Sequence, residues 1–367
     1  MNRISVIDFL RGLSCLGVLL YHIRVELWIG WWRIKSYPEE YSAFVKTAAW
    51  FSVPAPFLGY AILLFFLISG FCIHYPHTVP DAKPVWKDYF IRRFWRIYPP
   101  YLIAICFTAC ISYFCYLQWH DTTWDWNRIL RIASLSQNYP PENGQFLSNP
   151  SLWTIPLEVE FYILYPLAFC LFDQLRSKVM VFVALSLCCW SIYLNTIGIS
   201  WPSFTSLFLW PVWLLGGWAA RLYREQKLVL LKFPILFLAS AISLLFSLSS
   251  LLENWSSWIQ YLFWTTFYFV FFLLCLRNSD LLKRLTGKIV FDAISWLGRI
   301  SFSLYLVHFP LFKLFGYIHR EIWGMKPDNF FVTLTYLIPV IIIAWVFFIF
   351  VENPIHQWSK KTFHKRS

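Results

Sequence analysis

Repeated apolar stretches of about 20 residues most constrain the fold of this 367-residue chain. We place ten of them at roughly 5–29, 56–76, 97–117, 151–172, 178–198, 202–220, 233–252, 257–276, 298–318 and 329–351. A helix of about 20 apolar residues crosses the roughly 30 Å hydrocarbon core of a bilayer, where the backbone must satisfy its own hydrogen bonds. The sequence therefore predicts an all-α integral membrane protein with about ten transmembrane helices.

Composition supports the same class. The chain is 59% hydrophobic and 22% aromatic, and only 14% of its residues are charged, which is far from a soluble globular protein. One transmembrane domain over residues 1–355 accounts for nearly the whole length, followed by a short basic cytoplasmic tail, 356–367. The first apolar stretch is too long for a signal peptide and lacks a small-residue cleavage site, so we expect no removable signal.

The net charge of +12 follows the predicted topology. If the N-terminus is cytoplasmic, the inner loops and tails hold about two thirds of the 31 Lys and Arg residues. This is the positive-inside pattern, and it predicts that both termini are cytoplasmic. Since topology explains most of the basic charge, membrane lipid is an expected partner and nucleic acid is not.

Two ionisable residues, Arg11 and His22, interrupt the first apolar stretch. Eleven residues of helix turn through ~1100°, which leaves about 20° after whole turns, so both side chains project from one face ~16 Å apart. Ionisable groups at membrane depth are costly, and they usually face the protein interior or a wet cavity. This pair therefore predicts a path or a reaction site inside the protein.

Two arginines lie just before the third apolar stretch. Arg93 and Arg96 are three residues apart, so on a helix they share a face at the predicted cytoplasmic boundary. Paired guanidinium groups suit a phosphate or diphosphate because arginine donates in a rigid fork. Lipid headgroup contact combined with the positive-inside bias is the alternative interpretation.

The fourth stretch carries two carboxylates. Asn149 or Ser151 can cap its helix, and Glu158 would then lie ~10 Å below the outer edge. His22 lies ~25 Å up the first helix, so the two can occupy similar depths. Glu160 is ~200° away from Glu158 and is assigned to a polar-partner or helix-packing role. Glu158 is the candidate for chemistry, with a structural partner role as its alternative.

Polar residues also mark the ninth stretch. Ser301, Tyr305 and His308 form an i, i+4, i+7 stripe on one helix face, which suits either a site or ordinary helix packing. Glu352 ends the tenth stretch, where a helix-end role is the favoured interpretation. His74 and His77 are two histidines with no third ligand nearby in the sequence, so no metal site is expected.

The outer loop, roughly 118–150, is rich in tryptophan, amide and proline residues, including Trp119, Trp124, Trp126, Asn138, Pro140, Pro141 and Asn143. Such a loop could hold a sugar by stacking and hydrogen bonding. An interfacial aromatic belt is the alternative, and it is the commoner use of tryptophan at a membrane surface.

Six segments occur in a fixed order along nearly the whole chain. They are Arg11 with His22, Phe65–Phe71, Arg92–Pro99, Leu152-Trp153 with Glu158 and Phe161-Tyr162, Ser301–Pro310, and Glu352-Asn353-Pro354. Together they resemble the acyltransferase-3 family of integral-membrane acyltransferases. Val159 stands where the family often has a second glutamate, and the appended esterase-like domain of some members is missing. The chain thus resembles the stand-alone form.

The resemblance implies transfer of an acyl group, usually acetyl, from cytoplasmic acetyl-CoA or another acyl-CoA. The acceptor would be a hydroxyl of a surface polysaccharide, a lipid-linked glycan or peptidoglycan. It would be met by the membrane domain itself or through a separate extracytoplasmic partner. The expected location is a cell membrane, with a bacterial inner membrane as the first choice. A proton-coupled transporter of an anionic solute and a membrane scaffold are the competing interpretations.

The resemblance also implies roles for three arginines in binding the acyl donor. Arg93 and Arg96 would hold the nucleotide phosphates at the cytoplasmic mouth. Arg11 would neutralise further phosphate or guide the pantetheine arm.

Where the acyl group is transferred, His22 would act as general base or carry the acyl group. Glu158 would orient its imidazole, as a carboxylate does in a triad. Ser69, Tyr305 or His308 would donate to the oxyanion.

Overall fold

The computed structural model describes residues 4–79, 83–140, 149–172 and 177–363, and within these ranges the chain is built from helices without a β-strand. The prediction of an all-α protein is confirmed. The helices form two compact units. Unit 1 comprises residues 1–15, 60–86 and 157–299, and unit 2 comprises residues 16–59, 87–156 and 300–367. Helices α1 (Ser5–Glu26) and α7 (Thr154–Leu171) contribute residues to both units. The last two residues of η2 (Ala55–Ala61) and the first residue of α5 (Trp86–Trp119) also belong to unit 1.

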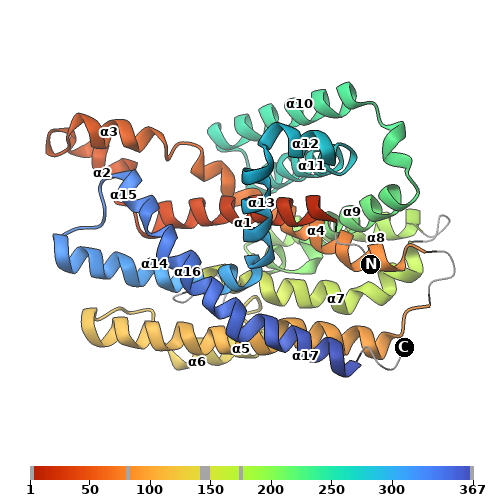
Figure 1. Ribbon diagram of the computed structural model, residues 1–367, viewed down its shortest axis with the longest axis horizontal. Coiled ribbons are helices and arrows are strands. Elements are labelled where there is room, and N and C mark those ends of the chain that lie inside the picture. Colours follow the sequence, from red (N-terminus) through yellow and green to blue (C-terminus); the bar gives the residue numbers. More distant parts are fainter. Residues whose placement is uncertain (1–3, 80–82, 141–148, 173–176, 364–367) are drawn as a thin grey trace. The chain divides into compact units, whose positions relative to one another are not determined.

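Unit 1 holds the start of α1 and most of α7, together with the middle of the chain. Its other elements are α4 (Ile62–His74), η3 (Tyr75–His77), α8 (Ser177–Thr196), η5 (Trp201–Phe204), α9 (Ser206–Arg224), η6 (Lys227–Leu230), α10 (Phe233–Leu252), α11 (Ser257–Arg277), α12 (Ser279–Thr286) and α13 (Lys288–Arg299). Extensive packing joins α10 to α11 and α4 to α9. Figure 1 shows α10 and α11 in green and teal within this unit.

Two helix pairs of unit 1 cross at glycines. A Cβ built on Gly70 of α4 would lie 2.0 Å from the Trp213 carbonyl oxygen, and one on Gly216 of α9 would lie 2.0 Å from that of Leu67. The same reciprocal contact joins α1 and α13 through Gly12 and Gly298, each facing a backbone oxygen at 1.9 Å. Since no Cβ tolerates such distances, glycine is what permits these backbones to touch.

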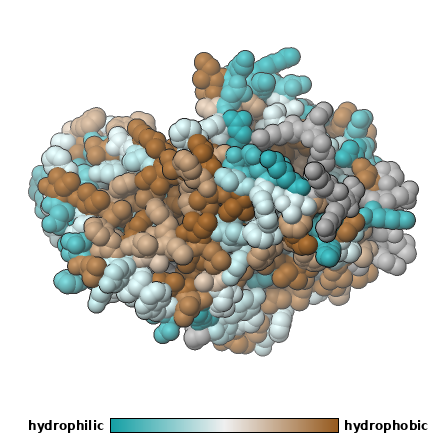
Figure 2. Space-filling model, turned by 60° about the horizontal axis from the view of Figure 1, so that its bottom comes forward, coloured by the Kyte–Doolittle hydropathy of each residue, from teal (hydrophilic) through white to brown (hydrophobic). Residues whose placement is uncertain are grey.

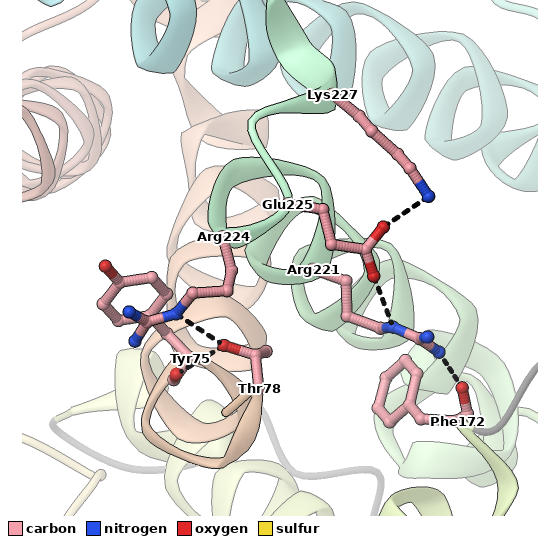
Figure 3. A network of polar contacts seen from close by, with 7 residues as sticks. All are labelled: Tyr75, Thr78, Phe172, Arg221, Arg224, Glu225 and Lys227. Atoms are coloured by element: carbon pink, nitrogen blue, oxygen red, sulfur yellow. Dashed lines mark hydrogen bonds and ion pairs between the residues drawn. The ribbon is translucent and has the colours of Figure 1, made fainter. Parts of the chain in front are cut away.

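The last turn of α9 is tied to its neighbours by side chains (Figure 3). Arg221 donates to the Phe172 carbonyl at the end of α7, and Arg224 Nε donates to Thr78 Oγ1 at 3.2 Å. Glu225 pairs with Arg221 at 3.7 Å. These arginines therefore satisfy a helix-end carbonyl and hold α7, α9 and the segment after η3 at one end of unit 1.

Unit 2 holds the rest of α1, the start of α7 and both flanks of the chain. Its other elements are α2 (Trp31–Ser36), η1 (Pro38–Glu40), α3 (Ala43–Trp50), most of η2 (Ala55–Ala61), α5 (Trp86–Trp119), α6 (Trp126–Ala133), η4 (Pro150–Trp153), α14 (Ser301–Trp323), α15 (Phe330–Thr335), α16 (Leu337–Phe347), the π-helical turn η7 (Phe348–Glu352) and α17 (Asn353–Phe363). In Figure 1 the dark-blue α17 lies beside the orange part of α5. A tryptophan pair joins these two helices, with Trp95 and Trp358 ring centroids 4.6 Å apart.

A proline in α14 explains an unusual hydrogen bond. Pro310 has no N–H, so the carbonyl four residues earlier, that of Leu306, loses its partner in the helix. Asn149 Nδ2 donates to this carbonyl at 2.9 Å, and Asn149 is 1% exposed. Asn149 thus stands at the N-cap position of η4, but its side chain makes no capping hydrogen bond. The Asn149 side chain satisfies a carbonyl of another helix, and Ser151 Oγ donates to Asn149 Oδ1 at 2.5 Å.

Eight helical segments among the described residues are long and apolar enough to cross a membrane. They coincide with eight of the ten predicted spans, and the remaining two, 151–172 and 202–220, form α7 and α9 with 18 and 19 residues. Large hydrophobic side chains stay exposed, such as Phe182 at 71% and Leu245 at 65%, as expected of a lipid-facing surface. Figure 2 shows brown hydrophobic residues over much of one face.

Consequently the chain is a multi-pass membrane protein. The number of ten spans and the cytoplasmic position of both termini stay predictions. The boundary at residue 355 also stays a prediction, although helix α17 runs through it from Asn353 to Phe363.

Candidate active site

His22 and His308 form a buried pair within unit 2. His22 Nδ1 lies 2.8 Å from His308 Nε2, and the two rings are nearly parallel, with an interplanar angle of 16°. His308 is fully buried, whereas His22 is only partly buried. The structure therefore brings together two of the predicted site residues, which lie 286 positions apart in the sequence. His22 is thus the more exposed member of the pair.

Backbone carbonyls determine how this pair shares its protons. His308 Nδ1 lies 2.9 Å from the Tyr305 carbonyl oxygen and 3.1 Å from that of Leu304. Carbonyl oxygens only accept, so His308 Nδ1 carries a proton, and a neutral His308 presents a lone pair at Nε2. A charged imidazolium would be costly at this fully buried position. His22 Nδ1 must then be the donor, which leaves Nε2 of His22 without a proton.

Tyr305, which shares a face of α14 with Ser301 and His308, is hydrogen-bonded to the segment around the start of α7. The Tyr305 hydroxyl donates to the Ser151 carbonyl and accepts from Thr154 Oγ1 at 2.6 Å. Since that one hydroxyl proton serves the Ser151 carbonyl, Tyr305 acts in packing in this arrangement. Ser301 is also buried. These contacts hold the α14 turn that positions His308.

Glu158 lies in a polar cluster of unit 1. Tyr162, one turn later on α7, donates to Glu158 Oε1, and Ser69 Oγ lies 3.5 Å from the same oxygen. Trp213 Nε1 donates to Ser69 Oγ at 3.3 Å. Ser69 is therefore oriented between an indole and a carboxylate, one residue before Gly70. Glu158 is partly buried, so it stays accessible from one side.

Arg11 lies in the same unit. Its Nη2 is 3.4 Å from Cys72 Sγ, and its charge interacts with the carboxylates of Asp8 and Glu158. The guanidinium is therefore partly balanced by acidic groups of unit 1. Arg11 and Glu158 are thus brought near each other, whereas His22 and His308 belong to unit 2.

Glu160 and Glu352 each bind the start of a helix. The sequence predicted a helix-end role for Glu352 and a polar-partner or packing role for Glu160. Glu160 Oε2 accepts from the Ser206 N–H at the start of α9, at 2.6 Å. Glu352 Oε2 accepts from both the N–H and the hydroxyl of Ser303, at 3.1 and 2.5 Å, in the first turn of α14. Each carboxylate satisfies an N–H that a helix leaves without a partner, and it also complements the helix dipole.

Arg93 and Arg96 lie on α5 in unit 2. The Arg93 guanidinium stands over the Tyr89 ring at 5.6 Å, one turn earlier. Both arginines are partly buried, which fits the predicted shared helix face. Their phosphate-binding role stays a prediction.

Side-chain amides of the predicted outer loop donate to backbone carbonyls of the protein itself. Asn138 Nδ2 donates to the Trp153 carbonyl at 2.7 Å, and Gln137 Nε2 donates to the Leu152 carbonyl at 3.2 Å. The Trp119 ring stacks on Tyr317 at 5.0 Å. These contacts anchor η4 and α14 rather than present the amides for a sugar. Pro141 and Asn143 lie outside the described residues.

The long apolar helices define a multi-pass membrane protein with polar clusters held inside each of its two units. A model of the acyltransferase-3 family, described as an acyltransferase domain, matches residues 4–349. The chain therefore belongs to this family, and it is a membrane acyltransferase.

A viral protein supports the same assignment. It is named "Putative acetyltransferase ORF330", comes from Acidianus two-tailed virus, and is 25% identical over 314 residues. The match covers 84% of this chain and 83% of the viral protein. No solved structure matches the chain.

Proposed function

We propose that this acyltransferase moves an acetyl group from cytoplasmic acetyl-CoA to a hydroxyl of a surface or lipid-linked glycan. The observation that carries the proposal is the hydrogen bond of 2.8 Å between His22 Nδ1 and His308 Nε2. It gives a partly accessible imidazole whose Nε2 is the basic atom. The acetyl group is supported by the name of the viral relative.

In the proposed reaction, His22 Nε2 accepts the proton of the acceptor hydroxyl as its oxygen attacks the thioester carbonyl carbon. A C–O bond forms, the C–S bond breaks, and the proton passes from His22 to the leaving thiolate of CoA. In the alternative course, His22 Nε2 itself attacks the thioester carbonyl carbon, so that the C–S bond breaks, CoA thiolate leaves and an acyl-imidazole forms. The acceptor hydroxyl then displaces the imidazole as the C–N bond breaks, and its proton passes to the thiolate. Both courses need the same unprotonated Nε2.

We assign the orienting role to His308 rather than to Glu158, because His308 occupies Nδ1 of His22. Like the acid of a triad, it fixes the tautomer of the base, although it does so as a neutral acceptor. Glu158, with Ser69 and Tyr162, remains a proposed part of the acyl-binding region beside Arg11. Arg93 and Arg96 are proposed to bind the CoA phosphates.

Labelled acetyl-CoA tests the proposed function directly. Purified wild-type protein in lipid nanodiscs should release one CoA thiol for each acetyl group that appears on an envelope glycan fraction. The thiol is measured colorimetrically and the acetylated glycan by mass. A folded protein that neither releases thiol nor transfers label would refute acetyl-CoA as donor. Thiol release without labelled glycan would refute the glycan acceptor alone.

The role of His308 has its own test. His308→Leu removes the acceptor of the His22 N–H, and we expect kcat to fall by about 100-fold with little change in the KM for acetyl-CoA. His308→Gln keeps a neutral acceptor of similar reach, so it should restore much of the rate. Equal losses in the two variants would show that His308 acts only as a packing residue.

A further inference from the structure

The basic C-terminal helix packs against the arginine-bearing end of α5. The Trp95 and Trp358 rings meet edge to face at 4.6 Å, and α17 lies beside α5 in Figure 1. Trp95 stands between Arg93 and Arg96 in the sequence, and Trp358 stands between His356 and Lys360. The contact therefore places side by side, within unit 2, the two helix segments that carry these basic residues.

Each pair has a spacing that places its members on one helix face. Arg93 and Arg96 are three residues apart, and His356 and Lys360 are four apart. His356 is affected by its burial and by the positive charges of Arg96, Lys360 and Arg93, which therefore lie near it. His356 and both arginines are partly buried, while Lys360 is exposed. The result is a cationic surface with contributions from two helices, open on the Lys360 side.

A surface that gathers several basic groups attracts anions, because a bound anion interacts favourably with all of them. Guanidinium groups bind phosphate oxygens in a forked geometry, and an ammonium group adds a point charge. Several cations converging from two directions suit a ligand with more than one phosphate.

We propose that His356 and Lys360 of α17 complete, with Arg93 and Arg96, a single binding surface for the clustered phosphates of CoA. This inference rests on the proposed function, and it gives the predicted tail a role in donor binding. The diphosphate and the 3′-phosphate of CoA supply the anionic groups that such a surface recognises. Anionic lipid headgroups share this chemistry, so the experiment must separate the two sources.

The test measures binding of CoA, dephospho-CoA and pantetheine to full-length protein in detergent without anionic lipid. We expect His356→Gln with Lys360→Gln to weaken CoA binding by about tenfold or more, because two charge-assisted contacts are lost. Pantetheine binding should not change. Lys360→Arg should retain the affinity. Lys361→Gln is the control, since Lys361 is an exposed neighbour on α17 outside the set of charges that act on His356.

Each result has a distinct meaning. Weaker CoA binding in the double variant alone, at an unchanged melting temperature, supports the inference. Unchanged CoA affinity in the double variant, with a loss in Arg93→Ala, overturns the role of α17 but leaves the proposed function standing. The same holds if the double variant loses only its binding to phosphatidylglycerol vesicles, which would assign the surface to lipid. Wild-type protein that binds no CoA would refute the proposed function together with this inference.

Discussion

Replacing His22 by alanine is expected to lower the acyl-transfer rate by about 10²- to 10⁴-fold, the usual contribution of a general base. The substitution removes Nε2, the atom that takes the proton, and leaves His308 buried beside a small cavity. Because Arg93 and Arg96 are untouched, the affinity for CoA should stay within about twofold of wild type. Single-turnover release of CoA thiol measures the chemical step directly.

The matched control is His319→Ala, which removes another partly buried imidazole, hydrogen-bonded to Tyr336 at 2.8 Å. It should keep the wild-type rate. If His22→Ala transfers acetyl groups as fast as this control, His22 is not the base, and the histidine pair is a packing feature. The membership in the acyltransferase family would be unaffected by that result.

The second large effect concerns stability. Gly70→Ala would place a methyl group 2.0 Å from the Trp213 carbonyl oxygen, where neither backbone can move without separating α4 from α9. Overpacking of this kind should lower the free energy of unfolding by about 3 kcal/mol. It should also reduce activity, because Ser69 and Trp213 adjoin the contact and orient Glu158. Thermal unfolding in detergent measures the first effect.

Gly316→Ala is the control for the same substitution in another helix. A Cβ on Gly316 meets its nearest atom, of the Leu27 side chain, at 3.4 Å, which is ordinary contact. Alanine is the better helix former, so this variant should be as stable as wild type or more stable by about 0.5–1 kcal/mol. Similar melting temperatures for the two variants would contradict the backbone contact between α4 and α9.

Much of this architecture was predictable because apolar periodicity and length are local properties of the sequence. All ten predicted spans form helices. The helix-end role of Glu352 also followed from a local argument, since a carboxylate near a helix boundary can accept from free N–H groups. Glu160 was expected only to act as a polar partner or in packing, and its bond to the start of α9 depends on a distant segment. His22 could be singled out because an imidazole is costly in an apolar stretch, whatever its partner.

The residues that contact these side chains from other helices could not be predicted in the same way. Helix spacing identified the face on which His308 lies but not the residue opposite it, and His22 is 286 positions away. The sequence therefore favoured a carboxylate as the orienting group by analogy with a triad. The glycine crossings were missed for a similar reason. Gly12, Gly70, Gly216 and Gly298 look like ordinary glycines in apolar helices until the opposing backbone is known.

The bond between Asn149 and the Leu306 carbonyl makes two distant positions depend on each other in evolution. Asn149 is needed because Pro310 withholds a backbone donor. A chain with alanine at position 310 would regain that donor, and a non-polar residue at 149 would then be tolerated. Related sequences should therefore exchange these two residues together, so that the amide and the proline are inherited as a pair.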